Sequence, residues 1–148
     1  MKRTLFDPTS RAAVIERLHR LTPDTPHLWG RMSAPQMVAH LIDQMQHCLG
    51  DKPCAPDRTY RHWPLIRWAA IYWIPWPKGA KGPPGAFVTK PTEWDADMTT
   101  LIALLDRFGA KDSSGKWPEH AQFGPMSGKD WGFMSYKHFD HHLRQFGR

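Results

Sequence analysis

Residues 127–146 read SGKDWGFMSYKHFDHHLRQF, and this stretch decides the fold more than any other part of the chain. Ser127 followed three residues later by Asp130 is the pattern of a helix start, in which each residue bonds to the backbone of the other. Large apolar side chains then recur every three or four residues at Tyr136, Phe139, Leu143 and Phe146. The spacing predicts an amphipathic helix over about residues 127–146.

The opposite face of this helix carries histidines. Residues four apart lie above one another on a helix, so His138 and His142 can present two ring nitrogens to one metal ion. His141 and Gln145 flank the pair. Such a pair also arises by chance in a chain with nine histidines, and a histidine-rich last turn suits the negative end of the helix dipole. A metal site therefore needs a third ligand from elsewhere.

A second two-sided helix is predicted over about residues 33–49. Ser33 and Gln36 match a capping box, and Gly50 is typical of the residue that follows a last turn. The apolar stripe consists of Val38, Leu41, Met45 and Cys48. The polar stripe consists of Gln36, His40, Asp43, Gln44 and His47, beside Met37. Because both helices are polar along one side, we expect these two sides to line one cleft.

Two further helices complete the pattern. One is predicted over about residues 8–20, where Asp7 can cap the first turn and Pro8 can begin it. The other is predicted over about residues 92–108, with Thr92 as its cap and Gly109 as its end. No segment shows a convincing strand pattern. We therefore predict an all-α fold, a four-helix bundle, in a single domain that spans residues 1–148.

A tryptophan-rich segment, WPLIRWAAIYWIPWP, occupies residues 63–77. We expect a short extra helix over about residues 63–74 that packs over the bundle and covers the mouth of a pocket. The alternatives are an interfacial membrane anchor and a dimer surface, because tryptophan with flanking cations suits an amphipathic boundary. The segment is too short to span a bilayer. The Pro-rich loops at residues 51–57 and 78–91 are candidate lids.

The composition narrows the class of protein. A chain of 148 residues, 41% of them hydrophobic, can bury a core without disulfides, and Cys48 and Cys54 have the spacing of neither a zinc knuckle nor a redox pair. The net charge is +6, but the basic residues are scattered, so nucleic-acid binding is not expected. The N-terminal residues lack the apolar run of a secretory signal, and we expect a cytoplasmic protein.

Five stretches resemble the DinB-like superfamily of metal-dependent helical-bundle proteins. They are LTP at residues 21–23, LWGRMSAPQMVAH at 28–40, WPKG at 76–79, HAQFGPMS at 120–127 and YKHFDHHLRQFG at 136–147. Together these stretches extend over nearly the whole chain and look like one uncharacterised branch of the superfamily. The resemblance implies a DinB-like four-helix bundle with a divalent-metal site.

The implied metal site takes one histidine from the second helix and two from the final helix. Those positions are held here by His40, His138 and His142. His141 and His47 are additional to this three-histidine pattern. Either could replace one of the three ligands, form a hydrogen bond to a ligand, or be exposed to solvent. Three imidazoles leave coordination positions open, as catalytic sites do, and they suit Zn²⁺, Ni²⁺ and Fe²⁺ alike.

Some members of the superfamily are thiol-dependent S-transferases, so the first hypothesis is an enzyme with a metal and a low-molecular-weight thiol as cofactors. In this hypothesis Asp43 or His47 positions or deprotonates the thiol, and Arg144 attracts its carboxylates. The hydrolase alternative uses water in place of the thiol, with His141 or Asp140 as the general base.

A small-molecule substrate is expected in both versions. The candidate pocket residues are Met37, Gln44, Trp131, Met134 and Gln145. The non-enzymatic alternative is a stress-associated metal-binding module whose tryptophan-rich segment forms a homodimer or binds a partner.

Overall fold

The structure is a computed structural model that describes residues 3–57, 63–80, 82 and 89–148. Within these residues it contains five helices and no strand. In chain order they are α1 (Pro8–His19), α2 (Ala34–Leu49), α3 (Pro64–Tyr72), α4 (Trp94–Ala110) and α5 (Gly128–Gln145). The predicted all-α fold is confirmed, and every helix begins and ends within two residues of the expected bounds.

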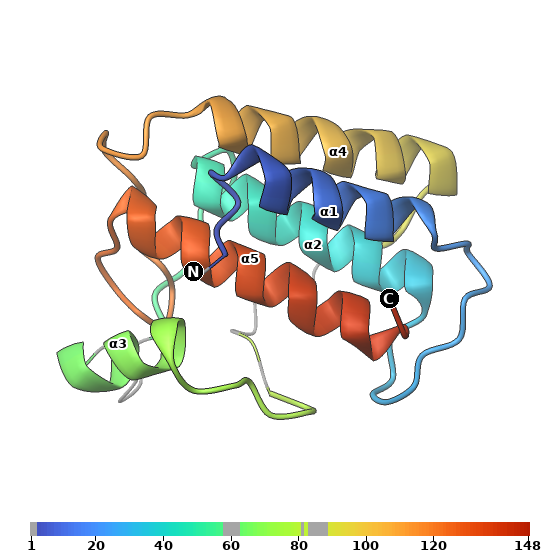
Figure 1. Cartoon of the computed structure of the whole chain (residues 1–148), viewed down its shortest axis with the longest axis horizontal. Coiled ribbons are helices and arrows are strands. Elements are labelled where there is room, and N and C mark those ends of the chain that lie inside the picture. Colours follow the sequence, from blue (N-terminus) through green and yellow to red (C-terminus); the bar gives the residue numbers. More distant parts are fainter. Residues whose placement is uncertain (1–2, 58–62, 81, 83–88) are drawn as a thin grey trace.

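Helices α1, α2, α4 and α5 form a four-helix bundle, with α3 outside it (Figure 1). Each bundle helix packs on two others, in the order α1, α4, α2, α5 around a closed ring. The colours of Figure 1 show that α1 and α5 run in one direction and that α2 and α4 run in the other. The connection from α2 to α4 therefore has to return along the length of the bundle, and it carries α3.

The core of the bundle is built from the apolar stripes of the four helices. The largest side chains with almost no exposed surface are Leu5, Leu18, Met37, Leu41, Met45, Leu101, Leu105, Phe108, Trp131, Met134, Phe139 and Phe146. Full burial of one such side chain contributes about 1.5–3 kcal/mol. This core fixes the position of α2 against α5, and both helices supply the site described below.

Three helix starts follow the sequence prediction. Ser33 and Gln36 form a complete capping box at the start of α2, and Ser127 and Asp130 form another at the start of α5. The carboxylate of Asp7 accepts from the backbone N–H of Ser10 at the start of α1. Each cap satisfies backbone donors that a helix end otherwise leaves without partners.

The predicted ends of α4 were wrong by one to two residues. Glu93 holds the cap position with no side-chain bond, because Thr92 donates instead to the carboxylate of Asp97 from both its backbone nitrogen (2.8 Å) and its hydroxyl (2.6 Å). The helix also continues past Gly109. A Cβ at position 109 would overlap the guanidinium of Arg11, so this glycine makes room for a neighbouring helix and does not end its own.

Helix α3 is bonded to the first turn and to the middle of α5. The Lys137 ammonium donates to the carbonyls of Ala70 (2.6 Å) and Ile74 (2.5 Å), where the end of α3 leaves acceptors without helical partners. The Tyr72 hydroxyl donates to Asp130 (2.5 Å). One face of α3 therefore packs on the bundle, as predicted. Its other face is exposed and carries Trp63, Leu65 and Trp68.

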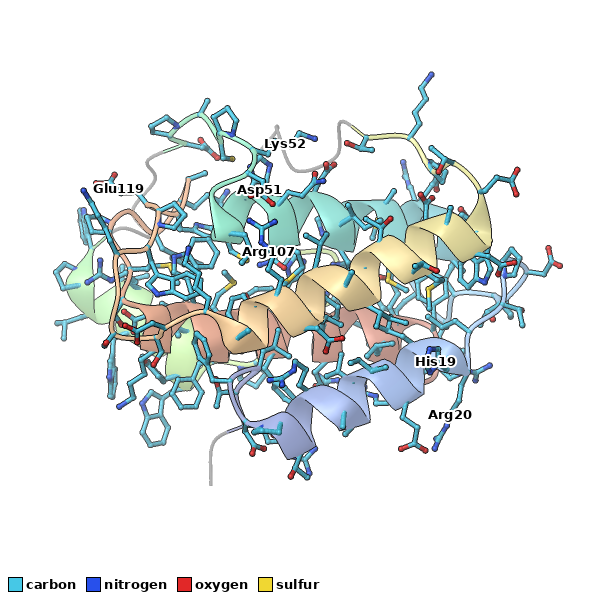
Figure 2. All side chains as sticks on the ribbon, turned by 90° about the horizontal axis from the view of Figure 1, so that it is seen from above. His19, Arg20, Asp51, Lys52, Arg107 and Glu119 are labelled. Carbon is cyan, nitrogen blue, oxygen red and sulfur yellow. The ribbon has the colours of Figure 1, made fainter. Side chains whose placement is uncertain are left out.

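The end of α2 is tied to α4. Figure 2 labels Asp51 and Arg107, whose carboxylate and guanidinium form two parallel bonds of 2.5 and 2.6 Å. This paired geometry is stronger than a single ion contact. Among the described residues, no helix has the length and apolar character needed to cross a membrane.

Candidate metal centre

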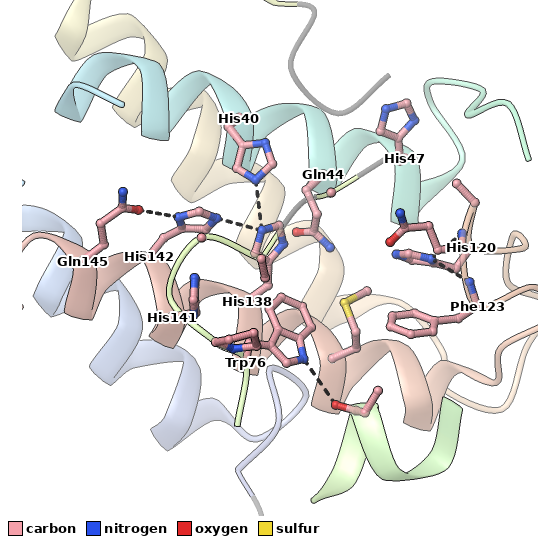
Figure 3. Close-up of a pocket in the computed structure, with 18 of the residues that line it drawn as sticks. His40, Gln44, His47, Trp76, His120, Phe123, His138, His141, His142 and Gln145 are labelled. Atoms are coloured by element: carbon pink, nitrogen blue, oxygen red, sulfur yellow. Dashed lines mark hydrogen bonds between the residues drawn. The ribbon is translucent and has the colours of Figure 1, made fainter. Parts of the chain in front are cut away.

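Three histidine rings meet where α2 lies against α5 (Figure 3). The Nε2 atom of His138 lies 3.0 Å from Nε2 of His40 and 3.0 Å from Nε2 of His142. One ligand atom from each of the three residues can be chosen so that all lie within 4.8 Å of one another. The structure thus brings together a residue of α2 and two residues of α5 that are about a hundred positions apart in the chain.

Two of the three nitrogen–nitrogen separations in this group fit a shared metal ion. Two nitrogens that each lie about 2.0–2.1 Å from one ion are about 2.9–3.4 Å apart when the angle between them is between a right angle and a tetrahedral angle. The two measured separations fall in this range. Among the described residues the group supplies three ligands, which would leave coordination positions of a bound ion open to other groups.

The site favours neutral imidazoles, which is the form that binds a metal. Burial lowers the pKa of His138 well below its ordinary value, and the neighbouring His142 and His40 lower it further. Burial, followed by the proximity of His40, lowers the pKa of His142 to about 3. A neutral ring keeps a lone pair on one nitrogen near pH 7, whereas a protonated ring has none to offer.

A glutamine fixes the orientation of His142. The side-chain nitrogen of Gln145 donates to the carbonyl of Trp29 (2.9 Å), so its oxygen faces Nδ1 of His142 at 2.9 Å. Nδ1 must therefore carry the hydrogen, and Nε2 of His142 keeps its lone pair toward the other two histidines. Gly30 makes this possible, because a Cβ there would overlap the Gln145 amide.

The three histidines lie at the wall of a cleft of about 520 Å³. This volume is within the range of small-molecule sites, about 300–1,000 Å³. The lining is largely apolar and aromatic: Trp29, Met32, Ile66, Ala70, Ile74, Pro75, Trp76, Pro77, Phe123, Trp131 and Met134. The polar groups lie mainly along α2 and α5, as the two polar stripes predict.

The segment after α3 covers the histidines. The Trp76 indole N–H donates to the carbonyl of Ala70 (3.2 Å), and its ring lies 5.4 Å from the ring of His138 and 6.0 Å from that of His141. Trp29 meets His141 edge to face at 4.8 Å. Two indoles from separate loops therefore limit the access of water to the site.

Four of the five candidate pocket residues line the cleft, namely Gln44, Trp131, Met134 and Gln145. Met37 does not line the cleft. Its side chain has no exposed surface and belongs to the core. Successive residues turn by about 100° around a helix, so Met37 lies about 60° from His40 on the side of the apolar stripe, whereas Gln44 and His47 lie within about 40° of it.

Asp43 also lies outside the cleft. Its carboxylate is fully buried and accepts from the Lys52 ammonium (2.6 Å) and from the hydroxyl (2.6 Å) and backbone nitrogen (3.2 Å) of Thr89. Burial alone would raise the pKa of Asp43, but these bonds outweigh it and the pKa lies below its ordinary value. Asp43 therefore ties two loop segments to α2 and belongs neither to the cleft lining nor to the histidine cluster.

The other candidate bases and cations separate into two groups. His47 and His141 both line the cleft, and burial lowers the pKa of His141. Asp140 and Arg144 do not line it. Asp140 is held by Arg17 (2.9 Å) and by Arg144 (3.1 Å), so its negative charge is balanced by these arginines outside the cleft lining. Of the arginines in the described part of the chain, Arg31 lines the cleft.

Several cleft residues were not predicted. Trp29 and Trp76 lie in loops, and both fall within the stretches that resemble the superfamily. Trp76 also belongs to the tryptophan-rich segment at residues 63–77. His120 lies at the far end of the cleft, where its Nδ1 accepts from the backbone N–H of Gln122 (3.1 Å) and of Phe123 (3.2 Å) (Figure 3). It is not one of the three clustered histidines.

Comparisons with known proteins place the chain in a family. Neither the curated proteins nor the solved structures include a match to it. A family model described as a protein of unknown function matches residues 2–148. That match covers all but the first residue of the chain, and the protein therefore belongs to the DUF1569 family.

Proposed function

We propose that this protein is a metal-dependent enzyme of the thiol S-transferase type, in which His40, His138 and His142 hold one divalent ion. The observation that supports it best is the meeting of three imidazole nitrogens, 3.0 Å apart in two pairs, at the wall of a large cleft. A closed structural zinc site would normally need a fourth protein ligand. We propose further that the bundle is a DinB-like domain, as the sequence resemblance implies.

The chemistry of the proposed site follows from its open positions. A divalent ion held there would lower the pKa of a thiol or a water molecule that occupies one of them. The residues around it orient and shield: Gln145 fixes the ring of His142, and Trp29 and Trp76 limit the access of water. A drier site strengthens every electrostatic interaction within it.

The cleft suits a thiol together with a second reactant. Its volume of about 520 Å³ exceeds what one small thiol fills, and its apolar walls suit a hydrophobic second molecule. Arg31 in the lining supplies the positive charge that an anionic thiol would need, a role that the sequence analysis gave to Arg144. These features support the transferase version of the proposal.

A metal-dependent hydrolase is the second candidate. One observation favours it: His141 lines the cleft beside the three histidines and, with its lowered pKa, is neutral near pH 7. A neutral imidazole can accept a proton from an attacking water. Asp140, the other base considered, is held by two arginines and is not available for this role.

A non-enzymatic metal-binding module that forms a homodimer is the third candidate. The observation that favours it is the apolar surface on the outer face of α3, which a second copy of the chain would cover. Trp63 is 58% exposed and Trp68 is 53% exposed. A homodimer through this face would bury both indoles. Sedimentation of the wild type and of Trp63→Ser/Trp68→Ser measures the dimer directly, since only the wild type would form it.

The test of the proposed function is elemental analysis of the purified, tag-free protein beside the His138→Ala/His142→Ala variant. The proposal predicts one metal per chain in the wild type and none in the variant. His120→Ala is the matched control, since this histidine lies in the same cleft but outside the cluster, and it should keep its metal. Stoichiometric metal in the double variant would overturn the three-histidine assignment.

Substitution with Co²⁺ then separates the candidates. Glutathione should shift the visible absorption of the Co²⁺ protein if a thiol occupies an open position, and 2-mercaptoethanol, which lacks carboxylates, should do so only at higher concentration. A spectrum that neither thiol changes would exclude the transferase version and leave the hydrolase and the binding module.

A further inference from the structure

Two hydrogen-bond acceptors in the cleft have no partner among the described residues. They are Nε2 of His47 and the side-chain oxygen of Gln44, and both atoms are buried. Both residues line the cleft, and both belong to the helix that supplies His40 (Figure 3). Buried polar atoms without a partner are rare in folded proteins, and a ligand is one of the groups that satisfies them.

The chemical character of the His47 acceptor is fixed by its other nitrogen. Nδ1 lies 2.8 Å from the backbone carbonyl of Lys52, which can only accept, so Nδ1 carries the hydrogen. In the neutral ring, Nε2 therefore presents a lone pair. A ligand atom that meets the neutral ring has to donate a hydrogen, and a carboxylate or phosphate oxygen cannot do so.

Gln44 presents the same character. Its side-chain nitrogen donates to the hydroxyl of Ser135 on α5 (3.2 Å), which leaves the oxygen as the acceptor. Residues 44 and 47 are three apart on α2, so their Cβ atoms are about 5–6 Å apart on one helix face. The wall of the cleft formed by α2 is thus an acceptor surface with two points of attachment.

We propose that His47 and Gln44 form a binding subsite for the N–H group of an amide or amine on the molecule that occupies the cleft. An NH₂ group offers at least two hydrogens, whereas a hydroxyl offers one and would leave more of this surface unsatisfied. The apolar lining of the cleft, which includes Phe123, Trp131 and Met134, suits a ligand with an aromatic or aliphatic body.

The subsite also sets a distance from the metal centre. His47 is seven residues from His40 and Gln44 is four, which corresponds to about 10 Å and about 6 Å along the helix axis. A molecule held at the subsite would therefore extend about 6–10 Å to reach the three histidines. The assignment of this molecule as the substrate rests on the proposed function; its binding at the subsite does not.

The experiment compares benzamide with benzoate, which has nearly the same shape but no N–H. Binding is followed in the full-length protein by NMR, before and after the metal is removed with a chelator. The readout is the ¹⁵N resonance of His47 Nε2 where this ring is present, and the backbone amide resonances of α2 in the variants at position 47. Benzamide should shift this resonance in both forms of the protein and benzoate should not. Benzylammonium in a third titration distinguishes an amine from an amide.

Two substitutions at position 47 separate the subsite from the loop contact. In His47→Asn, the side-chain amide places a donor near the former position of Nδ1 but no acceptor near that of Nε2. In His47→Gln, the side-chain oxygen lies near the former position of Nε2 and can act as the acceptor. Benzamide binding should weaken about threefold to tenfold in His47→Asn and be retained in His47→Gln, as expected for one hydrogen bond. Gln44→Leu should weaken it similarly, and Gln46→Leu, on the same helix outside the cleft lining, should not.

Equal binding of benzamide and benzoate, or the absence of benzamide binding at millimolar concentration, would overturn the subsite. So would benzamide binding that is unchanged in His47→Asn. The proposed function fails separately, if the wild type holds no metal, and that result leaves the ¹⁵N titration interpretable.

Discussion

Replacement of Gln145 by leucine is expected to weaken metal binding without removing a metal ligand. The substitution keeps the approximate volume of the side chain but removes the acceptor for Nδ1 of His142 and the donor to the carbonyl of Trp29, both at 2.9 Å. His142 can then rotate or change tautomer, and its Nε2 is presented to the ion for only part of the time.

The magnitude follows from the contacts that are lost. Removal of a group that orients a metal-binding histidine typically lowers the affinity for the metal 10–100-fold, which is about 1.4–2.7 kcal/mol. The carbonyl of Trp29 loses its donor as well, which lowers the free energy of unfolding by about 1 kcal/mol. We therefore expect Gln145→Leu to bind one equivalent of metal at least tenfold more weakly than the wild type.

The assay is a competition between the protein and a chelator of known affinity, followed by the absorption of bound Co²⁺. Gln145→Glu separates the two contacts, because its carboxylate still accepts from His142 but cannot donate to Trp29. It should retain metal affinity and lose stability. Gln46→Leu is the matched control and should change neither. An affinity of Gln145→Leu within threefold of the wild type would refute the reasoning.

Three further predictions concern stability. Asp43→Asn should lower the free energy of unfolding at pH 7 by about 2 kcal/mol, because the buried carboxylate loses its charged bond to Lys52. The pKa of Asp43 is lowered on folding, so this stability is present above the ordinary carboxyl pKa and is lost as the pH falls through the pKa of the folded state. In urea unfolding, the difference in unfolding free energy between wild type and variant should therefore shrink below about pH 4. A difference that stays constant with pH would contradict this prediction. Lys137→Met should speed amide hydrogen exchange in α3 about tenfold, since the carbonyls of Ala70 and Ile74 lose their donor, whereas exposed Lys129→Met should leave exchange unchanged. Gly30→Ala should lower the melting temperature, because position 30 has φ +88°, and should also weaken metal binding, because the new Cβ would displace the Gln145 amide that orients His142. A lower melting temperature with unchanged metal affinity would contradict the link to His142.

The parts of the fold that sequence could predict are those set by neighbours in the chain. The capping boxes at Ser33 and Ser127 depend on residues three apart, and the apolar stripes depend on residues three and four apart. The pairing of His138 with His142 has the same local origin. These contacts form wherever a helix forms, so the residue types alone predict them.

The third histidine could not be predicted in this way. His40 is 98 residues from His138, and nothing local relates the two helices. Their contact depends on the order of the helices around the bundle and on the directions in which they run, which the core sets as a whole. The polar stripe placed His40 on the side of α2 expected to line a cleft, but only the resemblance to a known superfamily selected it as a ligand. The geometry of α2 and α5 agrees with both.

The remaining errors arose at the edges of stripes and in loops. Met37 lies at the boundary between the apolar and polar sides of α2, where a turn of about 60° decides between core and cleft. Asp43 looked like a solvent-facing or catalytic carboxylate because its partners, Lys52 and Thr89, come from loops. Trp76 reaches the site from a loop, and loop positions depend on tertiary contacts that carry no periodic signal.

A crystal structure of the metal-loaded protein, with anomalous data at the absorption edge of the bound element, shows whether His40, His138 and His142 hold one ion with open positions in the cleft. We expect one anomalous peak about 2.0–2.1 Å from Nε2 of all three histidines, with no fourth protein ligand. A peak bound by His47 or His141 in place of one of them, or no peak at this position, would contradict it.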